Sequence, residues 1–176
     1  MMTDIKKIII TAAPSALCVI LPMAFHAVPN AGVLISPMHI PAFIAGLTIG
    51  PFYGLVVGLL GPFLSSILTG MPAFSYMPQM MIELASYAFF SGLLMRLVHT
   101  YNYMADLYIS LLLSMIAGRI AAGVCRAVFF SSGSYSFNAW LTSYFVSTWP
   151  AIIIQLAIIP AIVFALEKAN LIEKRY

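Results

Sequence analysis

Charged residues are scarce in this chain. Lys and Arg together number 8 and Asp and Glu 5 among 176 residues, which is 7% of the sequence, while 62% is hydrophobic. A soluble domain carries roughly 25% charged residues because its surface has to be solvated. So few charges cannot cover a water-soluble globule of this length. The composition therefore predicts an all-α integral membrane protein that forms a single domain over residues 1–176.

Cysteine and the common catalytic motifs are also rare or missing. Cys18 and Cys125 both lie in apolar runs without a CxxC pair, and the 3 histidines do not form a ligand set, so we expect no metal site and no cofactor. The sequence contains no Walker A loop, no HExxH and no GxSxG. We therefore expect a protein that is not an enzyme and does not hydrolyse ATP itself.

Long apolar runs occupy most of the chain. A membrane-crossing helix needs about 20 apolar residues, and the runs predict a bundle of six such helices, at 5–25, 37–50, 52–68, 78–97, 107–130 and 141–166. The first run follows two lysines like a signal peptide, but no clear small-residue cleavage site follows it, so we expect it to be retained. Gly50-Pro51 is a turn signal that separates the second run from the third.

Basic residues are distributed unevenly between the predicted connections. The stretches 26–36, 69–77 and 131–140 contain no Lys or Arg, whereas the opposite ends hold Lys6, Lys7, Arg96, Lys168, Lys174 and Arg175. Cytoplasmic loops carry the excess of basic residues. The pattern predicts both termini in the cytoplasm and an even number of crossings. We expect a multi-pass protein in a cell membrane of the prokaryotic type.

Small residues recur every fourth position at Gly46, Gly50, Gly54 and Gly58. This spacing allows helix backbones to approach closely in lipid, so we expect close helix packing there.

Three charged residues fall inside the predicted helices. A charge in the hydrocarbon region costs several kcal/mol unless it is paired or faces water. Arg119 and Arg126 are seven residues apart and therefore share a helix face, and Glu83 is expected at the depth of Arg126. In one interpretation Glu83 pairs with Arg126 and Arg119 contacts backbone carbonyls. In the other, the three residues line an outward-open cavity for a ligand that carries a carboxylate.

Further polar residues are expected towards the outer side of the bundle. A small polar ligand would satisfy several such groups together, and the candidates besides the three charges are His39, Gln79, Tyr87, Asn138 and Gln155. Each also has a structural explanation, such as a helix cap or an interfacial aromatic ring. Gln155 is the strongest of them, because an amide in the middle of an apolar run needs a partner.

Two stretches carry a resemblance to a known family. ISPMHIPAFIAGLTIGPFYGLVVGLLGPFLSSILTGMP at 35–72 and MMIELASYAFFSGLLM at 80–95, together with AGR at 117–119, resemble the substrate-binding S components of energy-coupling factor (ECF) transporters. The pantothenate-type branch is the most similar. The resemblance extends over nearly the whole chain.

This resemblance implies a six-helix fold that captures a vitamin from outside and docks on a membrane coupling subunit with two cytoplasmic ATPases. Ala12 and Ala16, with Ala13 beside them, match the small-residue docking pattern of the family's first helix, although ordinary helix packing would also explain them. The family's pocket is near the outer face, where the charges of this chain were also placed. Two basic groups against one acid favour an anionic ligand such as pantothenate, and pyridoxine, a thiamine precursor, cobalamin or a queuosine precursor are the alternatives.

Three other classes of function fit the sequence less well. A stand-alone channel or facilitator would need a polar path through the inner half of the bundle, and the sequence offers none. An intramembrane enzyme would need a catalytic pair, which is not found. A purely structural membrane subunit would leave Arg119 without a role.

Overall fold

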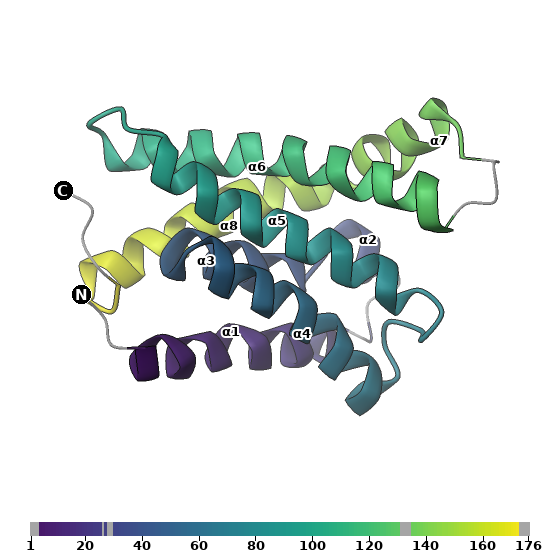
Figure 1. Ribbon diagram of the computed structural model, residues 1–176, viewed down its shortest axis with the longest axis horizontal. Coiled ribbons are helices and arrows are strands. Elements are labelled where there is room, and N and C mark those ends of the chain that lie inside the picture. The colour runs from purple at the N-terminus through teal and green to yellow at the C-terminus, as the bar shows by residue number, and fades with distance from the viewer. Residues whose placement is uncertain (1–3, 26, 28–29, 131–134, 173–176) are drawn as a thin grey trace.

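The computed structural model describes residues 4–25, 27, 30–130 and 135–172, and within these residues it contains helices and no strand (Figure 1). The predicted all-α class is confirmed. The helices are α1 Asp4–Ala24, α2 Ala31–Leu34, α3 His39–Ile49, α4 Pro51–Thr69, α5 Met77–Leu97, α6 Tyr103–Cys125, the π-helical turn η1 Arg126–Phe130, α7 Phe137–Leu141, the π-helical turn η2 Thr142–Val146 and α8 Trp149–Lys168.

Among the residues that the structure describes, four helical segments are long and apolar enough to cross a membrane. They are α4, α5, α6 with its continuation η1, and α8. The Thr11–Ala24 part of α1 and the helix α3 are apolar but shorter. The chain is thus a multi-pass membrane protein, and the number of six crossings remains a prediction.

The break between the second and third predicted helices lies where it was expected. Gly50 separates α3 from α4 with φ of 112°, a backbone conformation that favours glycine. Pro51 then begins α4, where its missing N–H leaves no intrahelical bond unmade.

The last predicted helix is wrong in its first part. A single helix was expected over 141–166, but α7 and η2 precede a long helix that begins only at Trp149. Thr148 has non-helical dihedral angles (φ −106°, ψ 10°), and Pro150 lies in the first turn of α8. Because proline has no N–H to continue a preceding helix, it favours a new start at this point.

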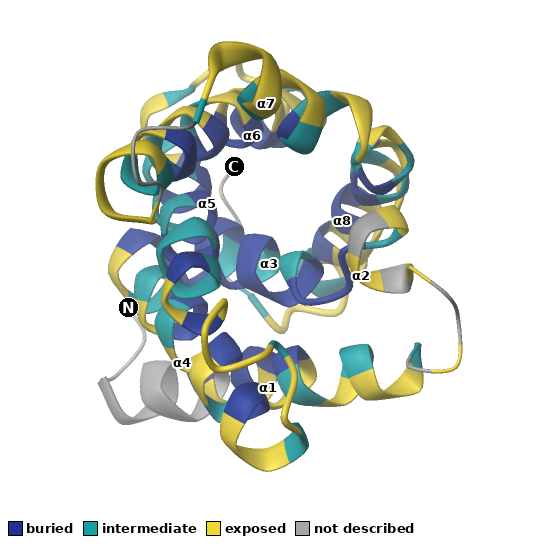
Figure 2. Cartoon of the chain, turned by 90° about the vertical axis from the view of Figure 1, so that its right-hand side faces the viewer, coloured by how far each residue is buried: buried dark blue, intermediate teal, exposed yellow. Residues whose placement is uncertain are grey.

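The bundle has two layers. In Figure 2 the helices α3, α5, α6 and α8 are arranged in a ring, and α1 and α4 pack outside α3 and α5. The glycines allow this close packing. A Cβ atom at Gly58 would lie 2.5 Å from the Cα atom of Ala85, and a Cβ atom at Gly54 would lie 2.7 Å from the Cα atom of Gly46. The close helix approach predicted from the glycine spacing is confirmed.

The two ends of the bundle differ. α1 begins and α8 ends at the same end, which also holds the 98–102 connection, whereas α2, the 70–76 connection and α7 lie at the opposite end (Figure 1). Arg96 and Lys168, in the last turns of α5 and α8, lie at the end where α1 begins and α8 ends. Lys174 and Arg175 are outside the described residues, as are the side chains of Lys6 and Lys7.

Candidate functional site

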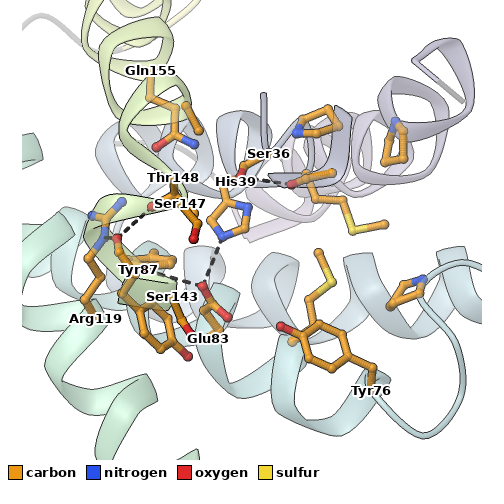
Figure 3. A pocket seen from close by; sticks show the side chains of 18 of the residues that line it. Ser36, His39, Tyr76, Glu83, Tyr87, Arg119, Ser143, Ser147, Thr148 and Gln155 are labelled. Atoms are coloured by element: carbon orange, nitrogen blue, oxygen red, sulfur yellow. Dashed lines mark hydrogen bonds and ion pairs between the residues drawn. The ribbon is translucent and has the colours of Figure 1, made fainter. Parts of the chain in front are cut away.

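A cavity of about 520 Å³ opens at the end of the bundle that holds α2 and α7. α3, α5, α6 and the η2–α8 segment contribute most of its wall (Figure 3). Its polar lining residues are Ser36, His39, Tyr76, Glu83, Tyr87, Arg119, Arg126, Ser143, Tyr144, Ser147, Thr148 and Gln155. Six of the eight predicted ligand-binding residues are therefore brought together, and Gln79 and Asn138 do not line the cavity.

Glu83, His39 and Tyr87 form a cluster on one wall. His39 Nε2 lies 3.4 Å from Glu83 Oε1, and the Tyr87 hydroxyl donates to the same oxygen at 3.4 Å. The Tyr87 ring packs against the rings of His39 and Phe43, with centroids 5.3 and 5.1 Å apart. These aromatic contacts hold the His39 and Tyr87 rings together beside the carboxylate.

One of the two interpretations paired Glu83 with Arg126, and this ion pair is not formed within the described part of the chain. The carboxylate lies with His39 and Tyr87 instead. Both charges nevertheless line the same cavity, in agreement with the similar depth expected for them.

Arg119 is buried, with 6% of its surface exposed. Its Nε donates to the carbonyl of Tyr144 at 2.8 Å and its Nη1 to the carbonyl of Met115 at 3.1 Å. The guanidinium carbon lies 5.6 Å from the Tyr87 ring centroid and 5.5 Å from that of Phe145. The carbonyl contacts considered for this residue are thus present, and the same side chain also lines the cavity.

Gly118 explains how Tyr87 and Arg119 come together. A side chain at this position would overlap the Tyr87 ring, so the missing Cβ allows α5 to bring the ring against α6 beside Arg119. On the other side, the Trp140 indole N–H donates to the carbonyl of Arg119 at 3.1 Å. Arg119 is therefore held between α5 and the 140–145 segment.

Arg126 lies at the junction of α6 and η1 and is half-buried. Its guanidinium carbon is 5.0 Å from the centroid of the Tyr135 ring. Burial raises the pKa of Tyr135 against the opposing effect of Arg126, and burial together with Glu83 raises the pKa of Tyr76. Because the ordinary pKa of tyrosine is about 10, both phenols are neutral at physiological pH and can donate hydrogen bonds.

The three predicted amide residues lie in different surroundings. Gln155 is 2% exposed and extends from α8 towards the cavity, and its Oε1 has no hydrogen-bond partner among the described residues (Figure 3). Gln79 is buried, and its Nε2 is also unpartnered within the described part. Asn138 is exposed on α7.

Comparison with known families identifies the chain. The model of a family described as "ECF transporter, substrate-specific component" matches residues 6–169. The protein belongs to this family. No match was found among curated proteins or among solved structures. ECF S components bind a small-molecule substrate and work with a membrane coupling subunit and ATPases, so this chain is a transporter component and not a member of an enzyme family.

Four lining residues of this S component, Ser143, Tyr144, Ser147 and Thr148, were not predicted from the sequence. Their spacing of four, in two pairs, does place them on one helical face. Serine and threonine in apolar helices commonly bond to their own backbone, however, as Ser15 does with the carbonyl of Thr11 and Ser86 with that of Ile82. Residue type alone therefore did not distinguish the lining residues.

The charge balance of the cavity indicates the kind of group that this S component can bind. Two guanidinium groups face one carboxylate, and guanidinium N–H groups match the geometry of a carboxylate or phosphate. No group of three or more potential metal-ligating side chains occurs among the residues that the structure describes. The lining is suited to a small organic anion.

Proposed function

We propose that the chain captures a water-soluble anionic vitamin or vitamin precursor, with pantothenate as the best candidate, in the cavity between α3, α5, α6 and α8. The observation that carries this proposal is the presence of two guanidinium groups against a single carboxylate in a cavity of about 520 Å³. Pockets for small ligands commonly measure about 300–1,000 Å³. Pantothenate offers a carboxylate for the arginines, and hydroxyl and amide groups for the remaining polar lining.

We propose further that the cavity opens to the outside of the cell membrane and that both termini are cytoplasmic. The positions of Arg96 and Lys168, at the end of the bundle opposite the cavity, support this orientation, because cytoplasmic ends of membrane helices are enriched in basic residues.

Docking on the coupling subunit is assigned to α1. Ala12, Ala13 and Ala16 are exposed, and Ala12 and Ala16 line an apolar groove of about 660 Å³ between α1 and α4. Small residues allow a helix of another subunit to approach closely in lipid, which supports a role for this face in assembly with the coupling subunit and its two ATPases.

The test combines Ala12→Leu with Ala16→Leu and measures both uptake and binding of radiolabelled pantothenate. Uptake by cells that contain the coupling module is expected to fall at least tenfold, because the larger side chains fill the docking face, while the Kd of the purified chain stays within about twofold. Ala157→Leu with Ala161→Leu, on the exposed face of α8, is the matched control and should leave both unchanged. Loss of binding in the α1 variant would contradict the docking role. Transport by the purified chain in vesicles without ATPases would instead support a stand-alone facilitator.

A further inference from the structure

The two arginines of the cavity have different partners, and this difference bears on the class of substrate. We propose, on the basis of the function proposed above, that Arg126 binds the anionic group of the ligand, that Glu83 accepts a hydrogen bond from a hydroxyl or N–H group of the same ligand, and that Arg119 is a positioning residue. The substrate class is then a small organic acid with a separate hydroxyl or N–H donor.

Arg126 has its hydrogen-bonding capacity available. No hydrogen bond from its guanidinium nitrogens meets the geometric criteria within the described residues. Its guanidinium carbon lies 5.0 Å from the centroid of the Tyr135 ring, and its charge opposes the rise in the pKa of that phenol. The side chain is half-buried and lines the cavity. A guanidinium in this setting presents its donors in the forked geometry that binds a carboxylate with two hydrogen bonds.

Arg119, in contrast, is largely committed to the protein. Two of its three nitrogens donate to the carbonyls of Tyr144 and Met115, and its own carbonyl accepts from Trp140. These bonds connect α6 to the segment that runs through η2 into α8. That segment supplies Ser143, Ser147 and Thr148 to the cavity wall. Arg119 therefore affects ligand binding mainly by holding these wall residues in place.

Glu83 retains one free carboxylate oxygen. His39 and Tyr87 both contact Oε1, and Oε2 has no hydrogen bond in the part of the chain that is described. The side chain is 12% exposed and lines the cavity. A carboxylate only accepts hydrogen bonds, so a ligand that contacts it has to bring a donor.

The charges lead to the same class of ligand. One negative charge on the ligand would balance the two arginines against Glu83, whereas a neutral ligand would leave the Arg126 cation desolvated without an anion. An acid without a donor would leave the free oxygen of Glu83 unmatched. Pantothenate and biotin have both features, and nicotinate has only the acid.

The experiment uses matched pairs of compounds with the purified full chain in detergent. Isothermal titration calorimetry compares pantothenate with pantothenol, biotin with its methyl ester, and nicotinate with nicotinamide, in the wild type and in Arg126→Gln and Arg119→Gln.

The wild type is expected to bind one of the two donor-bearing acids at least 100-fold more tightly than its uncharged partner. Arg126→Gln should reduce this ratio to about one. Arg119→Gln should weaken both members of the pair by similar factors and so preserve the ratio. Glu83→Gln should weaken both members, because it removes the carboxylate that accepts from their common donor.

The ratio separates a charge contact from a general loss of structure. Arg119→Lys provides a second variant with the same readout if Arg119→Gln does not fold, as judged by gel filtration. A preserved ratio in Arg126→Gln, or its loss in Arg119→Gln alone, would overturn the assignment of the arginines. Tightest binding of a neutral compound or of nicotinate would overturn the substrate class while leaving solute capture intact. No binding by any of the compounds would count against both the assignment and the proposed function.

Discussion

Arg119 in α6 and Arg126 at the start of η1 both line the cavity, yet their surroundings differ. Arg119 is enclosed by two aromatic rings and two carbonyls, whereas Arg126 stacks on one ring and faces the cavity. The cost of placing a charge in an apolar helix identified both as functional candidates. Their division of labour could not be predicted, because it depends on the 140–145 segment, which is distant in sequence and folds back on α6.

Gly118 gives a prediction at the scale of a single residue. Gly118→Ala introduces a methyl group where the Tyr87 ring packs, and overpacking of this kind costs about 1–3 kcal/mol. Because the displaced ring carries the hydroxyl that bonds to Glu83, we expect ligand affinity to fall about tenfold to 100-fold. Pantothenate titration of the purified protein measures the effect. Ala161→Gly, on the exposed face of α8, is a control for a change between the same two residue types. Unchanged affinity in Gly118→Ala would show that the Tyr87 position is not needed.

At the scale of elements, the start of α6 holds a buried acid that the sequence analysis did not single out. Asp106 is fully buried, and its Oδ1 accepts from the N–H and the hydroxyl of Thr100, both at 2.7 Å. Asn102 caps the same helix by accepting from the N–H groups of Met104 and Ala105. Together these contacts fix the short connection between α5 and α6 at the end opposite the cavity.

Asp106→Ala is therefore expected to destabilise the bundle without affecting the ligand site. Hydrogen bonds to a charged group contribute about 1.5–3 kcal/mol, which corresponds to a decrease of about 3–10 °C in melting temperature. Asp106→Asn keeps an acceptor oxygen and should lie between the alanine variant and the wild type. Thermal unfolding in detergent, with pantothenate affinity measured in parallel, tests this. A wild-type melting temperature in Asp106→Ala, or a large loss of affinity at unchanged stability, would disagree with a purely structural role.

The sequence predicted some elements well and others poorly, for physical reasons. Apolar length and the Gly50-Pro51 turn located α4 and α5 to within a residue or two. α7 was missed because 131–140 was interpreted as a connection, and η2 was merged with α8 because apolar residues continue through 141–149. Only the dihedral angles of Thr148 and the new start at Trp149 reveal the break. Rare charges in apolar runs identified much of the site, whereas the common serines and threonines did not.

At the scale of the whole molecule, the two ends of the bundle carry different features. The end with α2 and α7 holds the cavity with its two arginines, while the other end holds the termini of the helical bundle and the basic residues Arg96 and Lys168 (Figure 1). α1 and α4 form a separate layer beside the helices that surround the cavity. The proposed ligand site and the proposed docking face of α1 therefore lie on different parts of the molecule.

The central claim is that this cavity holds a small organic anion, and mass spectrometry of the compounds released from the purified, detergent-solubilised chain tests it most directly. The wild type, purified from cells grown in rich medium, should release one water-soluble acid at about one molecule per chain. Arg126→Gln, purified in parallel, should release much less of it, because the anionic group loses its charged partner. Release of a neutral or cationic compound instead, or of no small molecule by a wild-type chain that also binds none in titration, would contradict the account.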